Sequence, residues 1–228
     1  MKTIGLLGGM SWESSVEYYR IINTEVRRRL GGTASAELVM YSFDFSRIEM
    51  LQAAGEWDGA ADTLSDAAEG LEHAGADCIV ICTNTMHRLA DAVQRAIDIP
   101  LIHIADATGD EIRTAGVSHP LLLGTRYTME ADFYAGRLRD RHGIEVTIPN
   151  EPDRSVIHDV IYDELVQGVV SDASRHAYLG IIERAGEVDG VIAGCTEIEL
   201  LIGPDDVSVP YFPTARIHAL AAVDFALA

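Results

Sequence analysis

The sequence predicts an α/β protein built on mainly parallel sheets that are flanked by helices. Three observations support this: short apolar runs of strand length, longer segments with apolar residues at helical spacing, and a regular alternation of the two. Each strand-like run is followed by a helical segment, which is typical of parallel strands joined by crossover helices. The runs expected to form strands are residues 3–7, 37–43, 78–81, 101–104, 120–123, 144–148, 190–193 and 209–212.

The helical segments show apolar periodicity and capping signals at their starts. Between Val16 and Val26, apolar residues recur at steps of three and four, as one face of an amphipathic helix requires. Serine, threonine and aspartate side chains can accept hydrogen bonds from the first free amides of a helix. The N-cap candidates are Ser46 and Thr196, each followed three residues later by glutamate in a capping-box pattern, and Asp58 and Thr128.

The chain repeats itself weakly. Residues 4–11 resemble 120–127, residues 77–83 resemble 190–196, and residues 99–102 resemble 209–212. Three matches in the same order suggest two similar halves of about 110 residues each, which is an ordinary domain size. The same strand–helix units could instead close into one barrel made of two half-barrels. The pattern alone leaves both architectures open.

Charge and lysine content exclude several classes of function. The chain carries 36 acidic and 17 basic side chains and a net charge of −19, which argues against nucleic acid or an anionic membrane surface as partner. Lys2 is the only lysine. At the second residue it can serve neither as the Schiff-base lysine of a pyridoxal-phosphate enzyme nor as the lysine of a P-loop. Both of these classes are therefore excluded.

The cysteines and the N-terminus suggest a cytoplasmic protein with reduced thiols. Three cysteines are an odd number and too few for a disulfide framework. The sequence has no apolar run long enough for a membrane span, and it begins directly with a strand-like segment, so neither a membrane anchor nor a signal peptide is expected.

No metal site is expected among the candidate ligands. Cys78, Cys82 and His87, with His73 as a further ligand, are the residues that could form one. A strand would place positions 78 and 82 on the same face but about 13 Å apart, at ~3.3 Å per residue. Zinc ligands must converge on a single ion, so this set does not suit zinc.

Cys82 and Cys195 are the main candidates for chemistry. Each ends an apolar strand-like run, is followed by threonine, and precedes a helical segment. The carboxyl ends of parallel strands form the ligand crevice, and a helix start there would lower a thiol pKa. A twofold-related repeat would place the two sulfurs on opposite sides of one cleft. A buried, inert cysteine is the alternative, and it is our interpretation of Cys78.

Further side chains could bind a ligand at the same strand ends. The Gly8-Gly9-Met10-Ser11 turn follows the first strand and suits a carboxylate or phosphate, although a tight turn without a ligand explains it equally well. Other candidates are Thr125 as its counterpart in the second half, Arg47 as a bidentate carboxylate clamp, and Thr83, Asn84 and Thr85 as donors. His87, His103 and His158 could each act as a base, but no spacing pairs them.

At these residues the sequence resembles the cofactor-independent aspartate/glutamate racemases. Residues 5–14 together with Tyr18 resemble the opening of that family. Residues 81–87 and 194–198 resemble its two catalytic-cysteine motifs, and residues 161–165 resemble a further family stretch. The similarity runs through essentially the whole chain.

The resemblance implies a specific architecture and favours it over the barrel. It implies two pseudo-symmetric α/β domains, each with a four-stranded, mainly parallel sheet, an active site in the cleft between them, and a homodimer. Residues 1–103 and 208–228 would form the first domain, with Cys82, and residues 104–207 the second, with Cys195. The segment after about residue 207 would cross back to complete the first domain.

The resemblance also implies the activity, an amino-acid racemase that uses no pyridoxal phosphate and acts on aspartate or glutamate. Cys82 and Cys195 would transfer the α-proton as two bases on opposite faces of the substrate. Donors would stabilise the charge that develops on the substrate carboxylate, and Glu197 would hold the ammonium group. The expected substrate-binding residues are Met10, Ser11, Arg47, Thr83, Asn84, Thr85, Thr125, Gln167, Thr196 and Glu197.

One departure from the family pattern concerns substrate choice. The family commonly has a lysine within a Glu-Leu-x-x-Gly stretch, where it helps to hold the distal carboxylate. Here Val166 and Gln167 stand between Leu165 and Gly168. Arg47 and Gln167 would therefore have to hold the distal group, and the substrate side chain stays open.

Two other classes remain as alternatives. One is an enzyme that uses a single cysteine to decarboxylate or isomerise small diacids. The other is a non-catalytic small-ligand-binding module, which would keep Gly8, Gly9 and Arg47 without needing two thiols. The matching Cys-Thr pairs at positions 82 and 195 favour the racemase.

Overall fold

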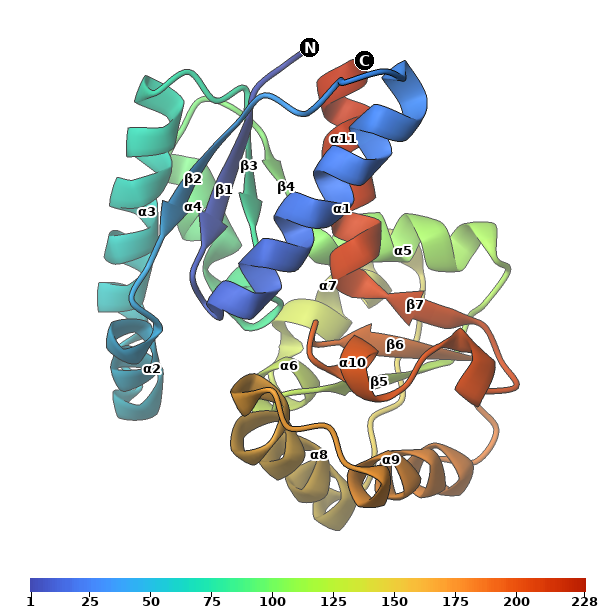
Figure 1. The fold of residues 1–228 in the computed structure, drawn as a ribbon. Coiled ribbons are helices and arrows are strands. Elements are labelled where there is room, and N and C mark those ends of the chain that lie inside the picture. Colours follow the sequence, from blue (N-terminus) through green and yellow to red (C-terminus); the bar gives the residue numbers. More distant parts are fainter. The chain divides into compact units, whose positions relative to one another are not determined.

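A computed structural model describes residues 1–228 and divides them into two compact units. Unit 1 comprises Met1–His103 and His218–Ala228, and unit 2 comprises Ile104–Ile217. All strand pairs in both units are parallel, and each sheet has helices packed against it (Figure 1). The predicted α/β class with parallel sheets is confirmed.

The sheet of unit 1 has four strands in the order β2-β1-β3-β4. Their bounds are β1 Ile4–Gly8, β2 Leu38–Ser42, β3 Cys78–Ile81 and β4 Leu101–Ile102. The central strands β1 and β3 are buried along their whole length, as expected for parallel strands that are covered on both faces. Cys78, at the start of β3, is fully buried, in agreement with its interpretation as a core residue.

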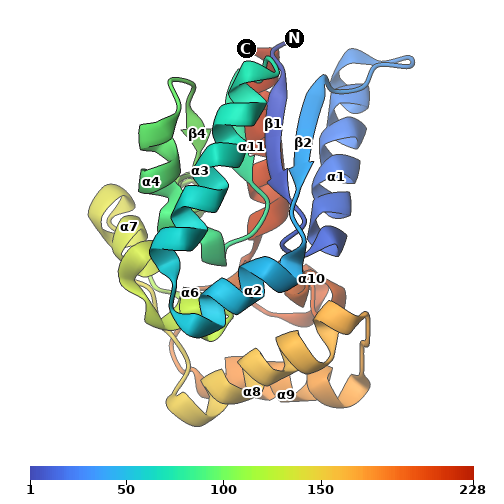
Figure 2. The same ribbon diagram turned by 90° about the vertical axis from the view of Figure 1, so that its left-hand side faces the viewer.

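Helices cover both faces of this sheet. In Figure 2, α3 (Trp57–His73) lies in front of the strands and α11 (Thr214–Leu227) behind them. Helix α1 (Trp12–Leu30) lies on the α11 side. The other helices of unit 1 are α2 Phe45–Ala54, η1 Thr85–Leu89 and α4 Ala90–Ala96.

The buried face of α1 differs from the predicted one. Of the apolar residues predicted to face inward, Ile22 and Val26 are fully buried, but Val16 and Tyr19 are about half exposed, and Tyr18 is buried instead. Tyr18, Ile22 and Val26 also have helical spacing, so periodicity predicted the helix and only part of its inner face. Packing against the rest of unit 1 decided which set is buried.

The sheet of unit 2 has three strands, where we expected four. Its order is β5-β6-β7, with bounds Pro120–Gly124, Gly190–Gly194 and Tyr211–Pro213. The segment expected as a fourth strand pairs with β5 only through a bridge between Thr147 and Leu121. Pro149 follows closely, and proline has no N–H to extend a ladder.

Helices pack on both faces of the second sheet as well. Figure 1 shows α5 (Ile104–Thr114) on one face, with α8 (Glu151–Asp163) and α9 (Asp172–Arg184) on the other. The remaining helices are α6 Arg126–Glu130, α7 Asp132–His142, η2 Leu165–Gln167, α10 Ile198–Leu201 and η3 Pro204–Asp206. No helix of the structure is both long enough and apolar enough to cross a membrane.

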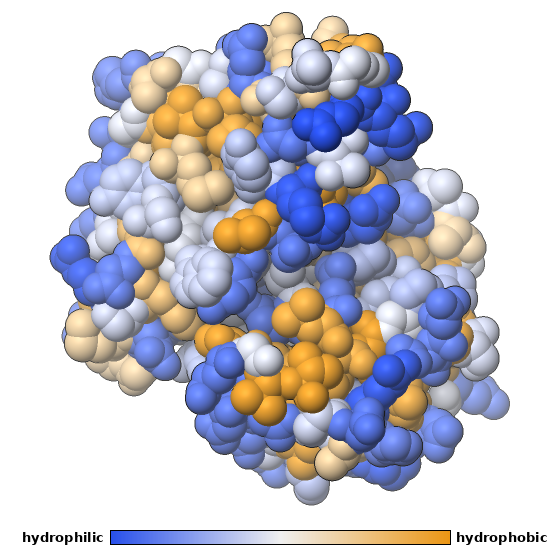
Figure 3. Space-filling view, in the orientation of Figure 1, coloured by the Kyte–Doolittle hydropathy of each residue, from blue (hydrophilic) through white to orange (hydrophobic).

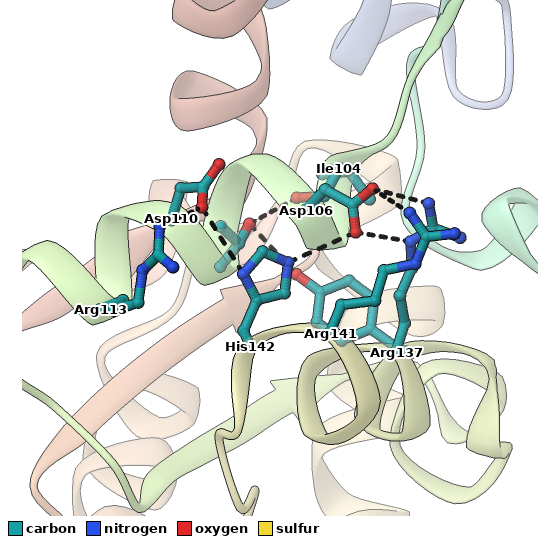
Figure 4. A network of polar contacts seen from close by, with 9 residues as sticks. Ile104, Asp106, Asp110, Arg113, Arg137, Arg141 and His142 are labelled. Carbon is teal, nitrogen blue, oxygen red and sulfur yellow. Dashed lines mark hydrogen bonds and ion pairs between the residues drawn. The ribbon is translucent and has the colours of Figure 1, made fainter.

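A cluster of charged residues fastens α7 to α5 within unit 2 (Figure 4). Arg137 donates two hydrogen bonds of 2.6 Å to the two carboxylate oxygens of Asp106. His142 and Arg141 lie 3.4 and 3.3 Å from the same carboxylate. Burial favours the neutral acid, but the hydrogen bonds and charges of these residues outweigh it and hold the pKa of Asp106 below its usual value.

The chain passes between the units at two places. It leaves unit 1 after His103 and groups with unit 1 again from His218, inside α11. We expected the return after residue 207. The later return follows from β7, which pairs with β6 and so keeps residues 211–213 in the sheet of unit 2.

Candidate active site

Three neighbouring strands of unit 1 end at one edge of the sheet. Gly8 pairs with Ser42, and Leu7 pairs with Ile81, so the residues that follow these strands emerge together. They are the Gly9 turn, the start of the α2 segment and Cys82. Cys82 therefore lies at the carboxyl edge of a parallel sheet, as predicted, where ligands of such folds bind.

The glycine turn after β1 has a geometry that requires glycine. Gly9 has a φ of +82°, and a Cβ atom there would lie 2.3 Å from the carbonyl oxygen of Phe43. Its amide donates to Ser15 Oγ at 2.7 Å, so this N–H is used within the turn. Met10 is buried, and the Met10–Ser11 peptide bond is cis. Ser11 caps α1 by accepting from the amide of Ser14.

The backbone around Cys82 is held from several sides. The Cys82 N–H donates to Leu7 O at 2.9 Å, and the Cys82 carbonyl accepts from Ser14 Oγ at 3.1 Å. The next carbonyl, that of Thr83, accepts from His87 Nδ1 at 2.8 Å. The thiol itself is fully buried, and burial raises its pKa well above the ordinary value. Asn84 and Thr85 follow it and are also buried.

Two neighbouring strands end together in unit 2. Gly124 pairs with Gly194, which places Thr125 and Cys195 at one edge of that sheet. Thr125 caps α6 and its side chain accepts from the amide of Thr128. The prediction of Thr128 as the cap was wrong, because Thr128 lies inside the helix and donates.

Cys195 is partly buried and contacts a carboxylate. Its thiol donates to Glu197 Oε2 at 2.9 Å. Burial and the negative charge of Glu197 together raise the pKa of Cys195 well above the ordinary value. Glu197 is itself buried, and Thr196 lies between the two residues.

We expected a helix start after each cysteine to lower the pKa of its thiol. This prediction was wrong, because both pKa values are raised. The helix after Cys82 is the five-residue 3₁₀ helix η1, and the helix after Cys195 is α10, which has four residues. Such short helices align few peptide dipoles, so burial dominates instead.

Arg47 lies on α2 and is exposed. The N-cap of α2 is Asp44 rather than Ser46, which lies one residue inside the helix. Arg47 lines a hollow of about 310 Å³ in unit 1, together with residues from the end of β2 and from α2 and α3. Its guanidinium makes no ion pair within the protein, and it is therefore available to an anion.

Gln167 lies in η2 and is also exposed. Its side chain donates weakly to the carbonyl of Tyr162, at 3.4 Å. Helix η2 contacts α10, which begins two residues after Thr196. Val169, Val170 and Leu200 of unit 2 are exposed apolar residues. Figure 3 shows apolar surface on the lower part of the molecule.

The two α/β units thus each carry a Cys-Thr pair at the carboxyl edge of a parallel sheet. The comparisons with known proteins then place the chain in a family. The profile of the Asp/Glu/Hydantoin racemases matches residues 7–222, and the chain belongs to that family.

Two solved structures are similar to this chain over its whole length. A crystal structure of a candidate Asp/Glu racemase from Yersinia pestis is 53% identical, with a TM-score of 0.95 and full coverage of both chains. An aspartate racemase homologue from Pyrococcus horikoshii OT3 is 37% identical, with a TM-score of 0.86 and full coverage of both chains. A broad-specificity amino-acid racemase of Bacillus subtilis (strain 168) is 25% identical over 186 residues, 75% of this chain and 74% of that protein.

The structure adds contacts that no sequence signal could have indicated. Ser14 holds the Cys82 carbonyl from α1, and His87 holds the next carbonyl from η1. The contact of Glu197 with the Cys195 thiol was also not expected, although Glu197 was expected near the substrate. These are long-range or side-chain contacts, and one sequence does not show them.

Proposed function

We propose that this protein is a racemase of aspartate or glutamate that uses no pyridoxal phosphate, with Cys82 and Cys195 as its two bases. The observation that supports this most strongly is the repeated Cys-Thr pair at the carboxyl edges of two parallel sheets. A binding module has no need of two such thiols, and a one-base enzyme needs only one.

The chemistry of racemisation suits two thiols. The α-proton leaves one face of the substrate, and another proton is delivered to the opposite face. One group acts as thiolate base and the other as thiol acid, each at about 3–3.5 Å from the α-carbon. The electron pair of the broken C–H bond is held as a carbanion or enediolate until the second thiol donates its proton. The opposite enantiomer reacts with the roles reversed.

The surroundings of the two thiols support an assignment of the resting proton. Glu197 repels a negative charge on Cys195 and accepts its hydrogen bond, so Cys195 retains its proton. Only burial raises the pKa of Cys82, and the arriving ammonium group of the substrate offsets part of that effect. In this scheme Cys82, rather than Cys195, is the thiol that loses its proton as the substrate binds.

The charged groups of the substrate would be shared between the candidate residues. Donors of the Cys82 loop and Thr196 stabilise the developing charge on the α-carboxylate, as preorganised hydrogen bonds do in other acid–base enzymes. Glu197 attracts the ammonium group. Arg47, whose guanidinium is unpaired, binds the distal carboxylate, and a local cation is needed in a protein of charge −19.

A screen of single amino acids in D₂O tests the proposal. Both α-proton exchange, followed by NMR, and loss of optical rotation are measured for each enantiomer without added cofactor. Aspartate or glutamate is expected to show exchange and racemisation together. Turnover of neutral amino acids alone would overturn the acidic-substrate assignment, and racemisation that required added pyridoxal phosphate would overturn the two-thiol scheme.

A further inference from the structure

Three buried histidines of unit 1 lie beside the Cys82 loop, and the proposed reaction uses none of them. His87 (2% exposed) belongs to η1, His103 (6% exposed) follows β4, and His218 (0% exposed) lies in α11. The centroid of the His87 ring lies 4.7 Å from that of His103 and 5.3 Å from that of His218. We call these three side chains the histidine cluster.

The hydrogen bonds of His218 identify its tautomer. Its Nε2 lies 2.6 Å from the carbonyl oxygen of Ile102, and a carbonyl can only accept, so Nε2 carries the hydrogen. Its Nδ1 then accepts from the hydroxyl of Tyr18 at 2.9 Å. Burial lowers the pKa of His218 to about 4, which keeps the ring neutral at neutral pH. Both ring nitrogens of His218 therefore form hydrogen bonds, which fix the ring in place. The His87 ring packs against it.

His87 contacts the loop itself. Its Nδ1 donates to Thr83 O at 2.8 Å, and the carbonyl of the preceding residue, Cys82, accepts from Ser14 Oγ at 3.1 Å. Two consecutive carbonyls are thus held by side chains from different elements. Ser14 orients the peptide between Cys82 and Thr83, and His87 orients the next one, between Thr83 and Asn84. The two bonds together hold the first two peptides of the loop that follows the Cys82 thiol.

Helix α1 contacts both the Cys82 loop and the histidine cluster. Ser14 and Tyr18 lie four residues apart, which places them on one face of the helix. Ser14 holds the Cys82 carbonyl, and Tyr18 holds the histidine that packs against His87. The loop is therefore connected to α1 directly through Ser14, and indirectly through Tyr18, His218 and His87.

We propose that His87 is a positioning residue for Cys82. Its Nδ1–H orients the loop through the Thr83 carbonyl, and the rings of His103 and His218 hold the His87 ring in place. His87 contacts no reacting atom in this scheme. The inference rests on the proposed function only in taking Cys82 as a reacting group. Small misplacements of such a group are costly, because proton transfer needs close alignment with the α-carbon.

Two variants separate the hydrogen bond of His87 from the packing of its ring. His87→Phe keeps an aromatic ring between the neighbouring histidines and removes the donor. His87→Asn removes the ring but places an amide N–H where Nδ1 lies. The rates at which iodoacetamide alkylates Cys82 and Cys195 are measured in the same sample by peptide mass spectrometry, so that Cys195, in unit 2, serves as the internal control.

His87→Phe is expected to raise the alkylation rate of the buried Cys82 by about fivefold or more, since a lost hydrogen bond shifts a local opening equilibrium by about that factor. Cys195 should stay within about twofold, and His87→Asn should leave Cys82 near the parent rate. An unchanged Cys82 rate in His87→Phe would overturn the proposal. Equal acceleration of both thiols, or an Asn variant that behaves like the Phe variant, would overturn it as well.

Steady-state kinetics supply a second readout. His87→Phe should lower kcat by about tenfold or more with KM nearly unchanged, and His87→Asn should restore much of kcat. A kcat that does not change in His87→Phe contradicts a positioning role. If the parent protein racemises no amino acid, the proposed function fails, and the alkylation rates still decide whether His87 positions Cys82.

Discussion

The two cysteine loops occupy matching positions in units 1 and 2 and differ in what surrounds the sulfur. Cys82 is fully buried, and its backbone is held by the side chains of Ser14 and His87. Cys195 is partly buried, and its thiol donates to the carboxylate of Glu197. The repeated motif therefore determines where each thiol lies, while residues outside the Cys-Thr pair determine how readily each thiol loses its proton.

The two loops also differ in the charges available to a substrate. The candidate cation, Arg47, belongs to unit 1, whereas unit 2 contributes the anion Glu197 and the neutral amide Gln167. An acidic amino acid carries a distal carboxylate and an ammonium group. The comparison thus predicts that unit 1 binds the distal carboxylate and that unit 2 attracts the ammonium group.

Loss of either thiol should have the largest effect. Cys82→Ser and Cys195→Ser should each lower the racemisation rate by about a thousandfold or more, because a hydroxyl is far too weak an acid to form the required anion. Racemisation is followed by optical rotation in both directions. Cys78→Ala is the matched control, since Cys78 is a core residue at the start of β3, at the opposite end of the strand from Cys82. A near-normal rate in either serine variant contradicts the two-base scheme.

His218 of unit 1 should make folding stability depend on pH. His218 has a pKa of about 4 in the folded protein because of burial, against about 6.5 in the unfolded chain. Between these values only the unfolded chain binds the proton. The free energy of unfolding should therefore be fully present above pH 6.5 and fall by about 3 kcal/mol towards pH 4.

Urea unfolding across this pH range measures the effect of His218. His218→Gln retains a donor for the Ile102 carbonyl but does not titrate, so it is the matched control. The parent protein should lose more stability than this variant between pH 6.5 and pH 4. Parallel curves for the two proteins would show that His218 is not the buried, neutral group that the structure describes.

Arg47→Ala should weaken binding of aspartate by about 1.5–3 kcal/mol, the range for hydrogen bonds to charged groups. The effect should appear in KM for aspartate or glutamate and should be much smaller for alanine. Gln167→Lys, at or beside the family lysine position, should strengthen aspartate binding. Unchanged aspartate kinetics in Arg47→Ala would show that Arg47 does not bind the distal carboxylate of the substrate.

Glu197→Gln should have a smaller effect, which is confined to Cys195. The amide keeps the size of the side chain and removes its charge, so the pKa of Cys195 should fall towards its ordinary value. At pH 8 the alkylation rate of Cys195 should rise by about tenfold, the factor that corresponds to one pKa unit. Cys82 should react as before. A change at Cys82 of the same size would show that the two thiols are not separately controlled.

The parts of the fold that depend on local pattern were predictable. Apolar runs and helical spacing indicated parallel α/β units, and strand-end positions indicated Cys82 and Cys195. The inner face of α1 and the number of strands in unit 2 were not predictable, because two apolar faces compete in α1 and a single pair, Thr147 with Leu121, replaces the expected strand.

The side-chain contacts of the candidate site were less predictable still. The sequence indicated Glu197 as an ammonium ligand, but its hydrogen bond with Cys195 depends on how the backbone turns after β6. Likewise, the spacing of the histidines along the sequence did not pair His87 with another histidine. Its neighbours in the structure, His103 and His218, come from elements that are distant in sequence. Thiol pKa values depend on burial, which became visible only in the structure.

The most direct test of the account is α-proton exchange in D₂O by the two single-thiol variants, with each pure enantiomer of the substrate found in the amino-acid screen. Cys195→Ser retains Cys82 and should exchange the α-proton of one enantiomer without racemising it. Cys82→Ser retains Cys195 and should exchange the proton of the other enantiomer only. If both variants exchange the same enantiomer, or if either exchanges both at equal rates, the two thiols do not work on opposite faces and the two-base mechanism is wrong.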